Sequence, residues 1–165
     1  MAPSSREGTD GLAVVETGPA HAALIAALRA ECFDDGGWSA ESVAALLGTP
    51  GTFALIAEVA GKPAGFILGR VAADEAEILS IGVPPALRRG GIAGRLLDAA
   101  LTRLGAAGIG RVFLEVGVNN GAARALYASR RFKSAGRRPA YYAKPAGPAE
   151  DALVLSLGLA DAASA

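Results

Sequence analysis

The sequence predicts a single-domain α/β protein, of the α+β kind, with a mixed, mostly antiparallel sheet of about seven strands flanked by four helices. Three observations predict this class. Short apolar runs with strand-like alternation recur along the chain and are bounded by Gly, Pro and Asp. Stretches with the apolar spacing of helices separate some of these runs. A helix joins the fourth and fifth expected strands, which implies a right-handed crossover and parallel pairing, whereas the earlier strands form an antiparallel meander.

Local signals place each element. Pro19 is favoured in the first turn of a helix, Ser39 is a good N-cap for the second helix, and Gly61-Lys62 is a hairpin turn. In chain order, the expected elements are strand 12–16, helix 19–32, helix 40–47, strands 52–59, 64–71 and 75–83, helix 92–106, strand 111–116, helix 120–130, and strands 132–138 and 152–157.

Length and composition limit the function classes. A chain of 165 residues is long enough for one domain with a sizeable core; we expect a disordered lead at 1–10, the domain at 11–157 and a tail at 158–165. No long apolar run predicts a membrane span. Sixteen Lys and Arg balance sixteen Asp and Glu, which argues against general nucleic-acid binding. One Cys and one His provide no disulfide framework and no metal-ligand cluster. We therefore expect a cytoplasmic protein with no metal, no membrane contact and no direct nucleic-acid partner.

A turn rich in Arg and Gly, residues 88–94, connects the fourth strand to the third helix. It begins with Arg88 and Arg89 and continues with mostly small residues into the helix that starts at Ile92. Glycine lets backbone approach a ligand closely, and a helix N-terminus favours negative charge, so the turn suits phosphate. A dinucleotide fingerprint has a different glycine register, and a Walker loop needs Gly-Lys-Ser/Thr. A phosphate-binding loop and an Arg-capped turn without ligand both remain open.

A second group of candidate residues lies around the fifth strand. Strand alternation puts Phe113 and Glu115 on one face, and a carboxylate in so apolar a strand is costly unless it is solvated, paired or used. Asn120 is a good N-cap, and Tyr127, seven residues later, shares its helix face. Taken singly, each has a structural alternative: Glu115 paired with an arginine, Asn120 as a simple cap, and Tyr127 as a half-buried core residue.

These segments together resemble one family. Read as R-x-x-G-x-A, the turn 88–94 resembles the pyrophosphate loop of the GNAT superfamily, the acetyl-CoA-dependent N-acetyltransferases. The pattern L-E-V-x5-A-x-x-A-L-Y, from Leu114 to Tyr127, resembles the bacterial RimI-type enzymes, which acetylate the N-terminal alanine of a small-subunit ribosomal protein. The order of elements over 11–157 is similar as well. The resemblance implies the GNAT fold, with a splayed parallel pair at the fourth and fifth strands.

The resemblance also implies roles for residues. Glu115 is expected as general base and Tyr127 as general acid in direct acetyl transfer from acetyl-CoA, without a covalent enzyme intermediate. The implied acceptor is the N-terminal amine of a protein, a ribosomal one. The implied coenzyme contacts are Ile81, Gly82, Val83, Arg88, Arg89, Gly90, Gly91, Ile92, Ala93, Gly94 and Asn120.

Two features depart from the family pattern. Arg131 stands where a glycine usually ends the helix in a left-handed conformation, so we expect a local difference in that turn. The region 140–148 is rich in Ala and Pro, which implies a differently shaped loop on the acceptor side. Two other functions remain open. The chain could be a GNAT enzyme for a small amine, amino acid or antibiotic, or a non-catalytic acyl-CoA-binding module.

Overall fold

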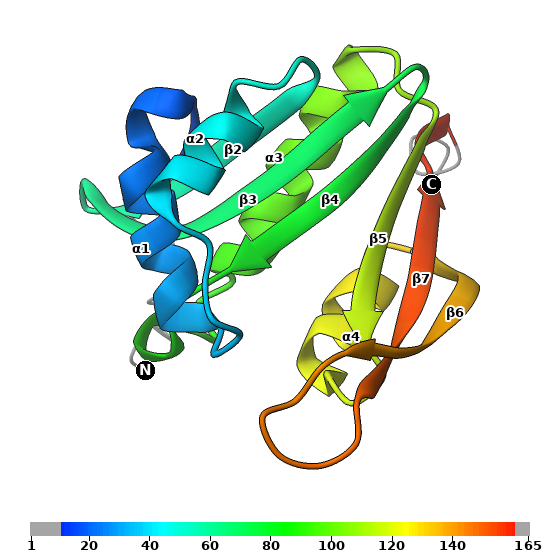
Figure 1. The fold of residues 1–165 in the computed structure, drawn as a ribbon. Coiled ribbons are helices and arrows are strands. Elements are labelled where there is room, and N and C mark those ends of the chain that lie inside the picture. The colour runs from blue at the N-terminus through cyan, green and yellow to red at the C-terminus, as the bar shows by residue number, and fades with distance from the viewer. Residues whose placement is uncertain (1–10, 161–165) are drawn as a thin grey trace, which may run out of the picture. The chain divides into compact units, whose positions relative to one another are not determined.

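The computed structural model describes residues 11–160 and contains one seven-stranded sheet in the order β1-β2-β3-β4-β5-β7-β6 (Figure 1). The expected lead, 1–10, and most of the expected tail lie outside the described residues. The strands are β1 Leu12–Thr17, β2 Thr52–Val59, β3 Lys62–Ala72, β4 Glu75–Gly82, β5 Arg111–Gly117, β6 Lys133–Tyr142 and β7 Glu150–Gly158. The α-helices are α1 Ala22–Cys32, α2 Ala40–Leu47, α3 Ile92–Ala106 and α4 Gly121–Ser129.

The predicted mixture of strand directions is confirmed. β4 and β5 are parallel, with a ladder from Glu75 opposite Arg111 to Ile78 opposite Leu114. β1 with β2, β5 with β7, and β6 with β7 are antiparallel. Glu115 is thus the first residue of β5 beyond its ladder with β4.

Two element boundaries differ from the prediction by three residues or more, and the others that differ do so by one or two. Pro19–His21 forms a 3-10 turn, and the α-helix begins at Ala22, because the tighter turn is common at a helix start. β6 continues to Tyr142 instead of ending at residue 138. It does so through an irregularity between Arg138 and Tyr142, where Ala140 has a φ of 51°. A sequence pattern with strict alternation does not extend through such a bulge.

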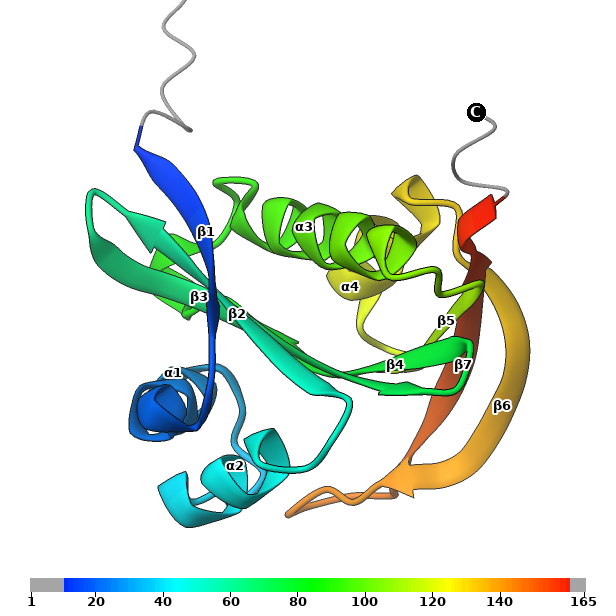
Figure 2. The ribbon, with the colours of Figure 1, turned by 90° about the horizontal axis from the view of Figure 1, so that it is seen from above.

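The described residues group into two compact units, the first of which comprises 11–68 and Ser80–Ala100. Figure 2 shows α1 and α2 on one face of β1, β2 and β3, and α3 on the other. Gly65 of β3 allows α3 to pack closely, because an added Cβ would lie 3.1 Å from Leu96 and 3.2 Å from Ile92. The fully buried side chains of this unit include Ile25, Val43, Phe66, Ile67, Leu68, Leu96 and Leu97.

A buried arginine organises the connection between α1 and α2. Arg29 is 6% exposed, and its guanidinium makes a two-point contact with the Asp35 carboxylate at 2.7 and 3.0 Å. It lies over the Trp38 ring at 4.2 Å and the Phe33 ring at 4.9 Å. The hydrogen bond from Arg29 lowers the pKa of Asp35. A planar guanidinium can bind a carboxylate at two points and stack on aromatic rings at the same time. These contacts therefore hold the segment between α1 and α2 in place.

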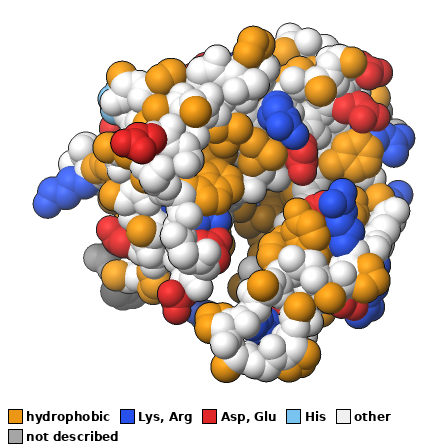
Figure 3. All heavy atoms as spheres, viewed as in Figure 1, with side chains coloured by type: hydrophobic (Ala, Val, Ile, Leu, Met, Phe, Trp, Pro, Cys, Tyr) orange, Lys and Arg blue, Asp and Glu red, His pale blue; other side chains and the backbone are white. Residues whose placement is uncertain are grey.

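The second unit comprises Gly69–Leu79 and 101–160. Its core lies between α4 and the inner strands; the buried side chains include Leu104, Val112, Leu114, Val116, Tyr127, Phe132, Leu155 and Leu157. β6 is the edge strand, and all ten of its residues are exposed. In the space-filling view of Figure 3, acidic and basic side chains are intermingled on the visible face of the chain. The formal net charge of the whole sequence is zero.

Candidate functional site

The 88–94 loop presents backbone N–H groups at the start of α3. Arg89 and Gly91 both have positive φ, 69° and 77°, and Gly90 lies between them. Left-handed residues that alternate with ordinary ones turn successive N–H groups toward one side and form an anion-binding concavity. An added Cβ at Gly91 would meet nothing within 4 Å, so a ligand has room to approach. The loop has the geometry expected of a phosphate site.

The start of α3 adds further donors to this loop. The first helical hydrogen bond runs from Arg95 N–H to the Gly91 carbonyl at 3.1 Å. The N–H groups of Ile92, Ala93 and Gly94 therefore have no acceptor within the helix, as in the first turn of any helix. Together with the partial positive charge of the N-terminus, they favour a bound anion.

The two arginines of the loop have different environments. Arg88 Nε donates to the Val83 carbonyl at 2.9 Å, so this side chain ties the loop back to the end of β4. It also contacts the Cys32 thiol: burial raises the pKa of Cys32, and the hydrogen bond from Arg88 opposes that rise. Arg89 is exposed. Arg89 is thus the better candidate of the pair for a phosphate contact, whereas Arg88 holds the shape of the loop.

The predicted coenzyme-contacting end of β4 is tightly packed. Gly82 and Val83 are buried, and Ile81 is partly exposed. A Cβ at Gly82 would lie 2.8 Å from the Phe66 ring and 2.9 Å from the Cys32 sulfur. Glycine is therefore required here by packing within the first unit, which contains all predicted coenzyme contacts from Ile81 to Gly94.

Glu115, in the second unit, has a defined set of neighbours. Val112, Leu114 and Val116 are buried, and Glu115 lies on the opposite, partly exposed face of β5, as predicted. Its side chain is 13% exposed, and Oε1 accepts from Arg138 Nε at 2.8 Å. The paired-carboxylate alternative thus has a named partner. Arg138 itself is 58% exposed, so the pair lies at the surface.

Two tyrosines complete what we call the Glu115 cluster, namely Glu115, Arg138, Tyr141 and Tyr142. A hydrogen bond to Glu115 raises the pKa of Tyr141, and the Arg138 guanidinium lies 5.4 Å from the centre of the Tyr141 ring. Burial, followed by the charge of Glu115, raises the pKa of Tyr142 to about 12. The cluster joins β5 to the irregular end of β6. Sequence reasoning did not predict the Arg138 contact, although the adjacent Tyr141-Tyr142 pair was a usable signal.

Tyr127 is buried in α4, with 4% exposure. Burial, and to a smaller extent the Tyr142 phenol, raises its pKa to about 12, so the phenol stays protonated at neutral pH. Its ring packs edge-on against Phe132, with the ring centres 5.8 Å apart. The Tyr127 ring is therefore part of the core, as in the structural alternative for this residue. Its burial does not decide whether the hydroxyl has a role in catalysis.

The end of α4 keeps the left-handed turn although Arg131 stands in place of glycine, so the local difference expected there is not found. Arg131 has a φ of 67°, its N–H donates to the Ala128 carbonyl at 3.0 Å, and the Phe132 N–H donates to the Tyr127 carbonyl at 3.1 Å. This is the Schellman arrangement, complete with the apolar contact that usually accompanies it. The turn is therefore made with arginine at the position where the resemblance implies glycine. Its left-handed φ strains the backbone because arginine has a Cβ.

Asn120 caps α4, as predicted. Its Oδ1 accepts from Ala123 N–H at 3.2 Å, and its own N–H donates to the Gly117 carbonyl at 3.0 Å. The side chain is exposed at the helix N-terminus, where its amide nitrogen is available to a ligand. Asn120 can cap the helix through Oδ1 and contact a ligand through its amide nitrogen, because the two roles use different atoms.

Two features that would indicate other functions were sought in the described part of the chain. Residues 11–160 contain no group of three or more His, Cys, Asp or Glu side chains arranged to hold a metal ion. Within the same residues, no helix combines the length and apolar character needed to cross a membrane.

Comparison with known proteins identifies the family of this chain. Residues 22–132 match the model of the acetyltransferase (GNAT) family. The chain is 38% identical over 97 residues to the [ribosomal protein bS18]-alanine N-acetyltransferase of Escherichia coli strain K12; the match covers 59% of this chain and 65%, just under two thirds, of that relative.

Solved structures show the same fold. The crystal structure of the ribosomal-protein-S18-alanine N-acetyltransferase from Escherichia coli is similar with a TM-score of 0.83 and 27% identity, covering 90% of this chain and 94% of that one. The structure of yncA from Salmonella typhimurium with its cofactor acetyl-CoA has a TM-score of 0.77 at 19% identity over 91% and 95% of the two chains, a likeness of fold. The chain belongs to the acetyltransferase (GNAT) family.

Proposed function

We propose that this chain transfers the acetyl group of acetyl-CoA to the N-terminal α-amine of a protein that begins with alanine, a ribosomal protein. The observation that carries the proposal is Glu115 on β5, partly exposed and surrounded by Arg138 and two tyrosines, within the pattern L-E-V-x5-A-x-x-A-L-Y that resembles the RimI-type enzymes. What those relatives acetylate supports the choice of acceptor.

The 88–94 loop is the proposed binding site for the pyrophosphate of acetyl-CoA. The positive φ angles of Arg89 and Gly91 and the free N–H groups at the start of α3 provide donors for phosphate oxygens. The open space beside Gly91 fits a close approach of the ligand. The backbone of Ile81 to Val83 and the amide of Asn120 are the further proposed contacts.

Glu115 is the proposed general base. An α-ammonium group, with a pKa of about 8, is mostly protonated at neutral pH and must lose a proton before its nitrogen can attack. The Glu115 carboxylate can accept that proton, directly or through a water molecule. The amine nitrogen then forms a bond to the thioester carbonyl carbon, the carbon–sulfur bond breaks, and the sulfur leaves with the electron pair.

Tyr127 is the proposed general acid for the departing sulfur. Its pKa of about 12 keeps the hydroxyl protonated through the working range. A thiol is a stronger acid, with a pKa of about 8.5, so complete proton transfer from this phenol to a thiolate is uphill by roughly 3 to 4 pKa units. We therefore propose that Tyr127 acts mainly by donating a hydrogen bond as negative charge develops on sulfur.

The test is acceptor selection. CoA release should be measured with an Ala-initiated peptide, with the same peptide already acetylated at its N-terminus, and with polyamines, amino acids and aminoglycosides. Activity restricted to the free peptide, with mass spectrometry that places the acetyl group on the α-amine, supports the proposal. Turnover of a small amine with an inert peptide would favour the small-molecule alternative, and acetyl-CoA binding without turnover of any acceptor would favour a binding module.

A further inference from the structure

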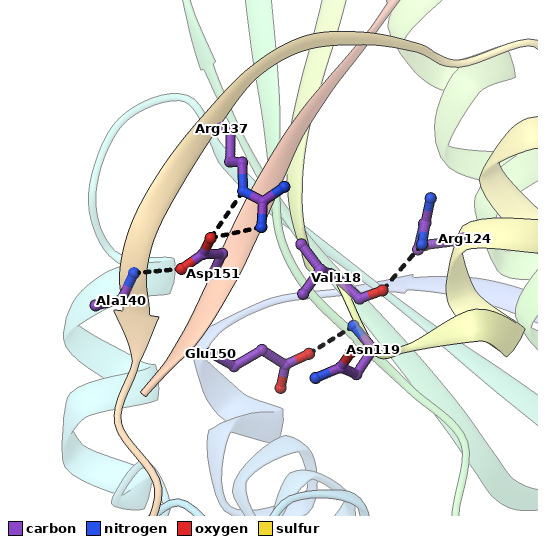
Figure 4. A network of polar contacts seen from close by, with 7 residues as sticks. All are labelled: Val118, Asn119, Arg124, Arg137, Ala140, Glu150 and Asp151. Carbon is purple, nitrogen blue, oxygen red and sulfur yellow. Dashed lines mark hydrogen bonds and ion pairs between the residues drawn. The ribbon is translucent and has the colours of Figure 1, made fainter. Parts of the chain in front are cut away.

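Two consecutive carboxylates at the start of β7 hold two different loops (Figure 4). Neighbouring strand residues point to opposite sides, so Glu150 and Asp151 face different partners. Glu150 Oε1 accepts from Asn119 N–H at 2.8 Å, whereas Asp151 Oδ1 accepts from Ala140 N–H at 2.7 Å. Neither carboxylate contacts Glu115 itself, although Glu150 lies opposite Tyr142 of the Glu115 cluster in the β6–β7 ladder.

Glu150 holds the turn that connects β5 to α4. This turn begins at Val118, three residues after Glu115, and ends at Asn120, the cap of the helix that carries Tyr127. An added Cβ at Gly117 would lie 2.6 Å from Glu150 Oε1, so glycine is required for the carboxylate to reach the turn. The Glu150 side chain is 14% exposed, and the Asn119 N–H is the main cause of its lowered pKa.

The turn is held from two further directions. The Val118 N–H donates to the Asp151 carbonyl at 3.0 Å, and Arg124 of α4 donates to the Val118 carbonyl at 2.9 Å. Backbone and side-chain bonds therefore fix the turn that leads from Glu115 to Asn120.

Asp151 holds the irregular end of β6. Ala140 has a φ of 51°, a conformation that costs free energy in a residue with a Cβ. The bond from its N–H to Asp151 compensates, and Arg137 binds the second carboxylate oxygen at 2.6 to 2.7 Å. On either side of Ala140 lie Arg138 and Tyr141, both of which contact Glu115.

We propose that Glu150 and Asp151 are positioning residues that act separately: Glu150 sets the coenzyme side through the turn before Asn120, and Asp151 sets the acceptor side through the bulge at Ala140. The assignment of sides rests on the proposed function, in which Asn120 contacts acetyl-CoA and Glu115 receives the acceptor amine. A pair of residues that merely stabilised the fold would affect both substrates alike.

The kinetic test uses alanine variants with conservative rescues. Asp151→Ala should raise KM for the Ala-initiated peptide about tenfold and leave the Kd for acetyl-CoA unchanged. Glu150→Ala should weaken acetyl-CoA binding about tenfold and leave KM for the peptide unchanged. Asp151→Asn and Glu150→Gln keep an oxygen acceptor for the N–H groups and should restore most of each loss. Lys144→Met removes the 3.3 Å ion pair of Glu150 without touching Asn119 and should behave as wild type.

Amide hydrogen exchange separates failure of this inference from failure of the proposed function. Asp151→Ala should speed exchange at Ala140 to Tyr142, and Glu150→Ala at Val118 to Asn120, whatever the acceptor proves to be. If exchange changes locally as expected but the enzyme does not acetylate Ala-initiated peptides, the proposed acceptor is wrong. The roles of Glu150 and Asp151 in holding the two loops are then still supported. Equal changes in both substrate constants, or exchange unchanged in both loops of an active enzyme, would overturn the positioning roles.

Discussion

The 88–94 loop and the Glu115 cluster are built from different parts of the chain. The loop uses the backbone of consecutive residues: its donors are N–H groups, and its shape comes from the φ angles of Arg89 and Gly91. The cluster uses side chains from β5 and β6. A site built mostly from backbone donors should lose only part of its affinity when one side chain is removed, whereas a side-chain cluster should fail when one functional group is lost.

The largest effect should come from the cluster. Glu115→Gln keeps the shape of the side chain and cannot accept a proton, so kcat/KM should fall by roughly 10²- to 10⁴-fold. The variant should recover in part at high pH, where the amine is already neutral. Rates measured from about pH 6 to 9 with an Ala-initiated peptide test this.

Glu77→Gln is the matched control, since Glu77 is also a strand carboxylate paired with an arginine, Arg70 at 3.5 Å. It should retain nearly full activity. Equal kcat/KM for Glu115→Gln and wild type at every pH would reduce Glu115 to the ion-paired carboxylate of the structural alternative.

Tyr127→Phe should lower turnover by roughly 10- to 100-fold with acetyl-CoA affinity retained, because it removes one hydrogen-bond donor and keeps the ring against Phe132. The same variant has a stability signature. The folded pKa of about 12 lies above the ordinary value of 10, so the folded state keeps a proton that the unfolded state loses. Stability should therefore be lost as pH rises from about 10 to 12, and less so in the variant. Unchanged turnover would leave Tyr127 a packing residue.

The loop should respond to backbone and charge. Gly91→Glu places a carboxylate and a strained φ where phosphate is expected, and Arg89→Ala removes a cation; each should weaken acetyl-CoA binding by roughly 1 kcal/mol or more. Gly108→Glu is the control for strain, since Gly108 also has a positive φ, 79°, and open space around it. It should reduce stability without changing acetyl-CoA affinity. Calorimetry with unchanged affinity in both loop variants would contradict the phosphate assignment.

The same contrast explains which features could be predicted from sequence. Helix 40–47 with its Ser39 cap, strand 52–59 and helix 92–106 were predicted at their observed bounds because each depends on neighbouring residues. The 88–94 loop is equally local.

The cluster is different because its contacts join distant segments. The pairing of Glu115 with Arg138 and the anchoring of Ala140 by Asp151, eleven residues further on, appear only when β5, β6 and β7 come together. Alternation along β6 gave no sign of a bulge, so the strand was predicted to end at residue 138.

The smallest expected effect tests whether the turn after α4 is a local feature of the backbone. Arg131 has a left-handed φ of 67°, which costs a residue with a Cβ about 1 kcal/mol relative to glycine. Arg131→Gly should therefore increase the free energy of unfolding. The gain is reduced by the extra conformational entropy that glycine has in the unfolded chain. Arg131→Ala is the control: it removes the guanidinium and keeps the Cβ, so it should change the free energy of unfolding by under about 0.5 kcal/mol. Both variants should keep full activity, because the Phe132 and Arg131 N–H bonds are made by the backbone. Denaturant unfolding in which Arg131→Gly is less stable than Arg131→Ala would mean that the arginine side chain contributes more at this turn than its backbone strain costs.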